Sequence, residues 1–182
     1  MNLPNKLTIL RIILVPVFVA CFYLPVEGAM YIAAVVFVVA YFTDMLDGYI
    51  ARKYNLITDF GKLMDPMADK LLTAAAMIML TAYGLCSPIA TFLTIGRELV
   101  ISAFRLVSAT QGVVIAAGKI GKLKTLTQFI GIVLILLGNP LFNRIGVPFD
   151  QIVIWISVVL AVWSCTDYIV KNLKACLLYT SD

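Results

Sequence analysis

Acidic residues gather in one short part of the chain, and their spacing suggests a shared function. Half of the ten Asp and Glu residues lie between positions 44 and 69. Residues three or four positions apart lie on one face of a helix, so Asp44 pairs with Asp47, and Asp65 pairs with Asp69. A short polar connection joins the two helices, which are expected to run antiparallel. This arrangement brings four carboxylates together at one end of a helical bundle.

Clustered carboxylates repel one another, so they need cations or protons to balance them. The chain has no histidine, and its four cysteines are scattered without the spacing of metal ligands. The remaining candidate ligands are the carboxylates, whose hard oxygen atoms suit Mg²⁺, Mn²⁺ or Ca²⁺. Four aspartates can hold two such ions for phosphoryl transfer. The lack of histidine also excludes Ser-His-Asp hydrolases, HExxH zinc enzymes and phosphohistidine chemistry.

Small and basic residues accompany the aspartates. Gly48 and Ala51 lie on the helix face of the first aspartate pair, where they leave space for a planar base or a phosphate. Arg52 lies one turn beyond, in a position to contact a phosphate. Asp65 precedes Pro66, which predicts that a helix starts at Asp65. The alternative is that these aspartates are solvated loop residues and helix caps.

The remainder of the chain is strongly apolar. It is 62% hydrophobic and 13% charged, with a mean hydropathy of +1.01, whereas soluble domains carry about 25% charged residues. A bilayer span needs roughly 20 apolar residues, and the chain contains about six candidates, near 7–24, 29–45, 67–85, 88–110, 123–141 and 152–170. We therefore expect an all-α, polytopic membrane protein, a six-transmembrane-helix bundle, and no nucleic-acid partner. Residues 1–175 are expected to form a single membrane domain, followed by a tail at 176–182 to which we assign no role.

Basic residues distinguish the two ends of this bundle. Eleven lysines and arginines would lie on the side of both termini, and Arg144 is the only one assigned to the other side. Lysine and arginine concentrate in short cytoplasmic loops. Both termini and the segments 48–62 and 110–124 are therefore expected to face the cytosol, where they would also attract anionic lipids.

The acidic motif resembles the complete signature of the CDP-alcohol phosphotransferase family. All eight fixed positions occur at the required spacing, in the order Asp44-x2-Asp47-Gly48-x2-Ala51-Arg52-x8-Gly61-x3-Asp65-x3-Asp69. The resemblance implies a six-helix membrane bundle, usually a homodimer, with its site at the cytosolic face. It also implies that an alcohol attacks a metal-bound, CDP-linked donor and releases CMP.

The resemblance implies a role for each motif residue. Two divalent ions, Mg²⁺ or Mn²⁺, would be held by Asp44, Asp47, Asp65 and Asp69. Asp69 would also act as the catalytic general base for the attacking hydroxyl. The donor CDP-diacylglycerol would contact Asp44, Asp47, Gly48, Ala51, Arg52 and Gly61.

The acceptor alcohol depends on residues outside this motif. Arg97 and Arg105 are eight residues apart and share a helix face. Arginine within a membrane is costly unless it has a partner or a wet cavity, and a phosphate would satisfy both side chains. This favours a phosphorylated acceptor over choline, ethanolamine or serine. The alternative pairs Arg97 with Glu98, but adjacent residues do not face each other on a helix, which predicts a poor pair.

Further segments resemble a branch of the family, the bacterial phosphatidylglycerophosphate synthases: 2–11, 61–70, 96–105 and 121–128. The implied reaction belongs to phospholipid biosynthesis at the bacterial cytoplasmic membrane. It converts CDP-diacylglycerol and sn-glycerol 3-phosphate to phosphatidylglycerol phosphate and CMP. The candidate residues for the acceptor phosphate are Lys62, Lys70, Arg97, Arg105, Lys124, Thr8 and Arg11. Two alternatives remain: a family member using inositol phosphate, inositol, serine or phosphatidylglycerol, and a cation transporter that uses the aspartates as an ion site.

Overall fold

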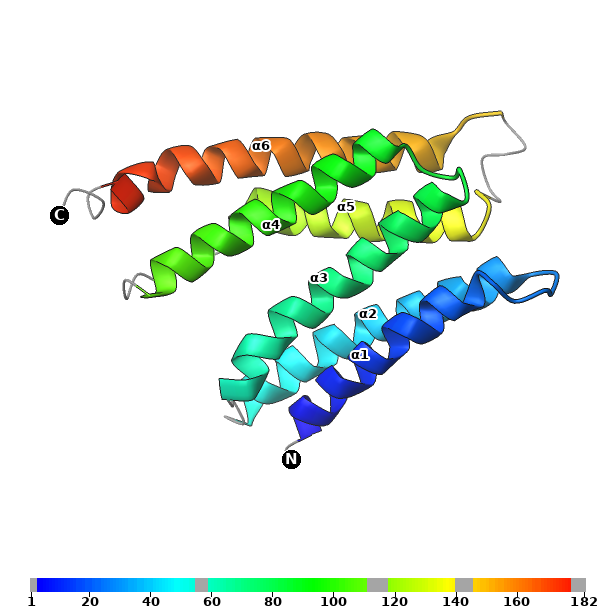
Figure 1. The fold of residues 1–182 in the computed structure, drawn as a ribbon, viewed down its shortest axis with the longest axis horizontal. Helices are drawn as coiled ribbons and strands as arrows, with labels where there is room; N and C mark the ends of the chain where they lie inside the picture. The colour runs from blue at the N-terminus through cyan, green and yellow to red at the C-terminus, as the bar shows by residue number, and fades with distance from the viewer. Residues whose placement is uncertain (1–2, 55–58, 111–117, 140–145, 178–182) are drawn as a thin grey trace.

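The computed structural model describes residues 3–54, 59–110, 118–139 and 146–177, and these form an all-α bundle (Figure 1). Six helices occur in these ranges: α1 (Leu3–Cys21), α2 (Ala29–Lys53), α3 (Asp59–Ala82), α4 (Pro88–Thr110), α5 (Lys119–Leu136) and α6 (Phe149–Leu177). Each corresponds to one apolar segment of the sequence, so the prediction of six helices is confirmed.

The helices extend further into polar sequence than hydropathy predicts. α2 continues to Lys53 and α3 begins at Asp59, whereas the predicted spans end near residue 45 and begin near residue 67. The prediction that a helix starts at Asp65 is therefore wrong, because Asp65 and Pro66 lie inside α3. Hydropathy detects the part of a helix that is removed from water, and the backbone hydrogen bonds continue beyond it.

The helices alternate in direction, which gives the bundle two distinct ends. The N-terminal ends of α1, α3 and α5 and the C-terminal ends of α2, α4 and α6 lie at one end (Figure 1). The ends of α2 and α3 that carry the acidic motif belong to this group. The structure therefore places the motif at the bundle end where α1 begins and α6 ends.

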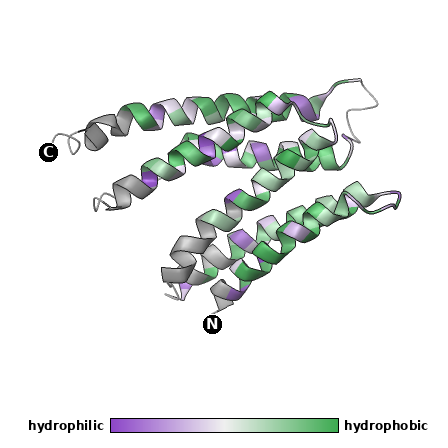
Figure 2. Cartoon of the chain, in the orientation of Figure 1, coloured by the Kyte–Doolittle hydropathy of each residue, from purple (hydrophilic) through white to green (hydrophobic). Residues whose placement is uncertain are grey.

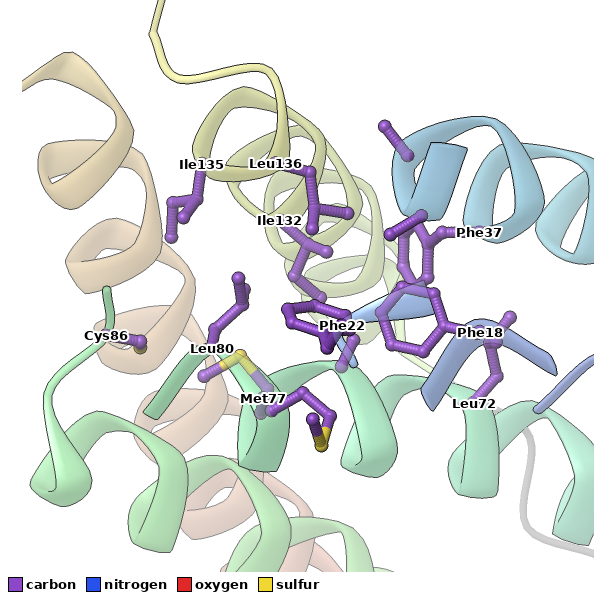
Figure 3. Packing of buried hydrophobic residues seen from close by; sticks show 14 of the residues in the cluster. Phe18, Phe22, Phe37, Leu72, Met77, Leu80, Cys86, Ile132, Ile135 and Leu136 are labelled. Atoms are coloured by element: carbon purple, nitrogen blue, oxygen red, sulfur yellow. The ribbon is translucent and has the colours of Figure 1, made fainter. Parts of the chain in front are cut away.

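The six helices pack as two groups of three. In the first group, α1 lies against both α2 and α3; in the second, α6 lies against both α4 and α5. The hydrophobic core continues across both groups, with Phe18 of α1, Phe37 of α2 and Ile132 of α5 all fully buried (Figure 3). The rings of Phe37 and Phe129 stack with centroids 5.8 Å apart, and so join α2 to α5.

Two backbone features fix the second group. Gly131 of α5 lies so close to α6 that an added Cβ would be 2.7 Å from Ile154 Cδ1. After α5, Gly138 and Asn139 both adopt positive φ angles, of 70° and 53°. The Asn139 amide donates to the Val147 carbonyl oxygen (3.1 Å), which ties the end of α5 to the approach to α6.

The outer faces of the helices are apolar. Large hydrophobic side chains such as Val35, Phe92 and Trp163 are mostly exposed, and hydrophobic residues occur along each helix (Figure 2). Two described segments, Ala29–Leu46 and Phe149–Val170, are long and apolar enough to cross a bilayer by length and composition. Exposed apolar surface on this scale requires a non-aqueous environment, and lipid provides it.

Candidate active site

The acidic motif is divided between two helices that contact each other, α2 and α3. The last ten residues of α2 contain Asp44, Asp47, Gly48, Ala51 and Arg52, and the first twelve residues of α3 contain Gly61, Lys62, Asp65, Asp69 and Lys70. Only Asp44 and Lys70 of this set have described side chains. The side chains of the other eight lie outside the described part of the structure, so their roles stay predictions.

Asp44 forms an ion pair with an arginine of α1. The Arg11 Nη1 atom lies 2.6 Å from Asp44 Oδ1, with the Arg11 side chain fully buried and the Asp44 side chain 36% exposed. Thr8, one turn before Arg11, is also buried. α1 therefore supplies a fixed positive charge to a predicted metal ligand. Arg11 is also one of the residues predicted for the acceptor phosphate, and that role stays a prediction.

A second group of charges lies between α4 and α5. Glu98 Oε1 accepts hydrogen bonds from Arg97 Nη1 (2.8 Å) and from Lys124 Nζ (2.6 Å). The expectation that Arg97 and Glu98 form a poor pair is wrong, because both side chains are long enough to bend toward each other although their Cβ atoms point apart. Lys124 is almost completely buried, so this carboxylate lies beside a cation removed from water.

Serines extend this group to α3 and α6. The Arg97 Nη2 atom donates to Ser164 Oγ of α6 (2.9 Å). Lys70 Nζ of α3 donates to Ser102 Oγ of α4, and that hydroxyl donates to the Glu98 carbonyl oxygen. We call this set the Glu98 cluster; it consists of Lys70, Arg97, Glu98, Ser102, Lys124 and Ser164.

The structure brings together only some of the residues predicted for the acceptor phosphate. Lys70, Arg97 and Lys124 belong to the Glu98 cluster. Arg105 lies elsewhere on α4, with its guanidinium carbon 5.9 Å from the centre of the Tyr168 ring. Thr8 and Arg11 lie on α1, and the Lys62 side chain is outside the described residues.

Three members of the cluster were not named as site residues from sequence: Glu98, Ser102 and Ser164. Glu98 did carry a signal, since a carboxylate within an apolar helix needs a cationic partner. The two serines carried none, because serine in an apolar helix usually bonds to its own backbone. Among the described residues, no group of three Asp, Glu, Cys or His side chains is placed to hold a metal ion.

Comparison with known proteins identifies the family. Residues 1–163 match the sequence profile of the CDP-alcohol phosphatidyltransferases. The chain belongs to this family. Its members are polytopic membrane proteins, so the predicted type of membrane bundle is confirmed.

Individual members of the CDP-alcohol phosphatidyltransferase family resemble the chain over nearly its whole length. A protein of Bacillus subtilis is 39% identical over 186 residues, covering 96% of both chains. One of Rickettsia typhi is 38% identical and covers 98% of both, and one of Escherichia coli K12 is 40% identical and covers 92% of this chain and 93% of its own. All three are named CDP-diacylglycerol–glycerol-3-phosphate 3-phosphatidyltransferase.

Proposed function

We propose that the chain transfers the phosphatidyl group of CDP-diacylglycerol to sn-glycerol 3-phosphate, giving phosphatidylglycerol phosphate and CMP. The relatives named for this reaction match both its length and about two fifths of its residues. The chain is then a transferase of phospholipid biosynthesis. The observation that carries the choice of acceptor is the Glu98 cluster.

The donor side of the site belongs to α2 and α3. The four aspartates of the motif are hard oxygen donors on two contacting helices, and this donor set fits two Mg²⁺ or Mn²⁺ ions. When bound, the ions stabilise the charge that develops on the departing CMP. The ion pair with Arg11 holds Asp44, so that this ligand would be oriented before the donor arrives. Gly48, Ala51 and Gly61 would shape the cytidine pocket, and Arg52 would contact the donor phosphates.

The proposed general base, Asp69, lies directly before Lys70 in α3. The Lys70 ammonium contacts Ser102, and so joins this turn of α3 to α4. An acceptor held beside α4 would therefore approach α3 near Asp69, which takes a proton from the attacking hydroxyl. The carboxylate must lie within hydrogen-bond reach of that hydroxyl.

The acceptor phosphate is assigned to the Glu98 cluster because its charges favour an anion. Among the side chains that the structure describes there, Lys70, Arg97 and Lys124 contribute three cations, against the single carboxylate of Glu98. Moreover, the buried Arg97 Nε atom has no hydrogen-bond partner among the residues that the structure describes. A phosphate oxygen would accept from it, and a phosphate monoester would balance the excess positive charge. An uncharged acceptor such as inositol could accept that hydrogen bond, but it would leave the excess positive charge without compensation.

We also propose that the enzyme is a homodimer in the bacterial cytoplasmic membrane, with its active site facing the cytosol. The excess of lysine and arginine at the bundle end that carries the motif supports this orientation. Accessibility labelling of cysteines introduced at the two ends of the bundle in intact cells tests the orientation. Cross-linking within the membrane tests the dimer.

Reconstituted enzyme with CDP-diacylglycerol tests the reaction itself. Lipid product and CMP are measured with glycerol 3-phosphate, inositol phosphate, inositol, serine and phosphatidylglycerol supplied separately. We expect product from glycerol 3-phosphate and from no other alcohol. A chelator should abolish activity, and Mg²⁺ or Mn²⁺ should restore it. The Asp65→Asn variant should form no product. Product only from another alcohol would reassign the acceptor, and cation flux without CMP release would identify a transporter.

A further inference from the structure

We infer that Glu98 is the positioning residue of the acceptor site, holding Arg97 and Lys124 in the geometry that receives the phosphate of glycerol 3-phosphate. This inference rests on the proposed function. Glu98 itself does not contact the acceptor in this assignment; it acts through the two cations.

The geometry of one oxygen atom supports this role. Glu98 Oε1 accepts from Arg97 at 2.8 Å and from Lys124 at 2.6 Å, so a single atom fixes the separation of two long, flexible side chains. One cation comes from α4 and the other from α5. Without this bridge the charged ends of the two side chains would be less constrained relative to each other, and ordering them for every substrate molecule would cost binding free energy.

The direction of the arginine is fixed as well. Its Nη1 donates to Glu98 and its Nη2 donates to Ser164 of α6. Because the guanidinium is planar and rigid, two bonds at these nitrogens determine where the third, Nε, points. This third nitrogen is the one that has no partner among the described side chains. Glu98 and Ser164 together thus present the Nε–H bond of Arg97 to the phosphate.

The charge of Glu98 allows a positioning role to be distinguished from simple charge compensation. A carboxylate repels a phosphate, so Glu98 lowers the attraction of the cluster for the acceptor. Its side chain is 19% exposed and its partner Lys124 is 2% exposed, so the carboxylate also compensates a buried charge. A residue that only compensated charge would weaken phosphate binding, and its removal would strengthen that binding. A positioning residue has the opposite effect when it is removed.

Kinetics of Glu98→Gln tests this difference. Glutamine keeps the size and one acceptor oxygen but loses the charge that holds both cations. We expect the KM for glycerol 3-phosphate to rise at least tenfold, with the KM for CDP-diacylglycerol within twofold of wild type. The preference for glycerol 3-phosphate over unphosphorylated glycerol should fall by a similar factor. Glu98→Asp should recover part of the loss, since it restores the charge on a shorter side chain.

Two further variants complete the experiment. Ser164→Ala removes the Nη2 bond of Arg97 without altering a charge, and should raise the KM for glycerol 3-phosphate about threefold to fivefold. Asp150→Asn is the matched control: it neutralises a carboxylate near the opposite end of the bundle, where Asp150 accepts from Asn139 and Gln151. It should leave both KM values unchanged. If Glu98→Gln fails to fold, as judged by gel filtration and circular dichroism, Ser164→Ala and Glu98→Asp decide the question.

Failure of the inference differs from failure of the proposed function. Wild-type enzyme that makes no product from glycerol 3-phosphate would refute both. Active wild type combined with an unchanged or lower KM for glycerol 3-phosphate in folded Glu98→Gln would refute the positioning role alone. A rise confined to the KM for CDP-diacylglycerol would refute it too, because the residue would then act on the donor.

Discussion

Replacing Arg11 with methionine should destabilise the bundle and release Asp44. The Arg11 side chain is fully buried, and its Nη1 atom lies 2.6 Å from Asp44 Oδ1. Methionine fills most of the same volume but provides neither the charge nor the hydrogen bonds. The substitution therefore leaves a carboxylate without its partner on α1, which packs against α2 along most of its length.

The size of the effect follows from the burial of the two partners. Removing one partner of a buried ion pair costs about 3–5 kcal/mol. Asp44 is 36% exposed, so solvent compensates part of its charge and the expected cost falls to about 2–3 kcal/mol. At roughly 2–4 °C per kcal/mol for a chain of this length, the midpoint of thermal unfolding should fall by about 4–12 °C.

A double-mutant cycle measures the pair itself. The wild type, Arg11→Met, Asp44→Asn and the double variant are unfolded by heat in detergent micelles without divalent metal, so that metal binding does not contribute. We expect the two changes to be non-additive by about 1.5–3 kcal/mol. Arg11→Lys should recover part of the stability, because it keeps the charge but not the planar fork.

Lys6→Met is the control, since it removes a positive charge from an exposed position of the same helix. It should change the midpoint little. Additivity of Arg11→Met and Asp44→Asn to within about 0.5 kcal/mol would refute the reasoning. So would a midpoint for Arg11→Met that matches the Lys6→Met control, because the buried pair would then contribute no net stability.

Three other substitutions or measurements test separate features. Gly131→Ala should lower the free energy of unfolding by about 1–3 kcal/mol, because its Cβ would overlap Ile154. Gly96→Ala should not lower it, since nothing lies within 4 Å of the added atom. Equal midpoints of thermal unfolding for the two variants would contradict this prediction. Asn139→Ala should be less stable than Asn139→Gly by about 1 kcal/mol, since φ is 53° and only glycine adopts it without strain; the same unfolding assay compares the two. Burial raises the pKa of the Cys86 thiol. In a variant that retains only this cysteine, alkylation by iodoacetamide should be slow at about pH 8, and its rate should still rise with pH above the usual thiol pKa. A rate that levels off at a lower pH would contradict the shift.

The positions of the helices could be predicted from the sequence because a helix that faces lipid must be apolar. Each lipid-facing helix must be apolar over roughly 20 residues, and the span predicted for α4 coincides with the helix, Pro88–Thr110. The ends of α2 and α3 could not be predicted in this way. There the chain leaves the apolar environment but keeps its backbone hydrogen bonds, so composition changes before the helix ends.

The contacts of the charged residues were less predictable. Helical periodicity places residues on a face, but it does not say which face of another helix is opposite. Glu98 and Lys124 are 26 residues apart, and their contact depends on how α4 and α5 are arranged around α6. The Arg97–Glu98 pair fails the periodicity rule for another reason. That rule describes Cβ directions, whereas the contact is made by atoms at the ends of long side chains.

The packing of the helices in two groups of three has a consequence for how enzymes of this kind diversify. The proposed donor motif lies entirely on α2 and α3, whereas five of the six members of the Glu98 cluster come from α4, α5 and α6. On the proposed assignment of the two sites, mutations that alter the choice of alcohol would accumulate in one half of the gene while the nucleotide chemistry in the other half stays intact. A chimera that takes residues 88–177 from a family member with a different acceptor should inherit that member's alcohol and keep the same lipid donor.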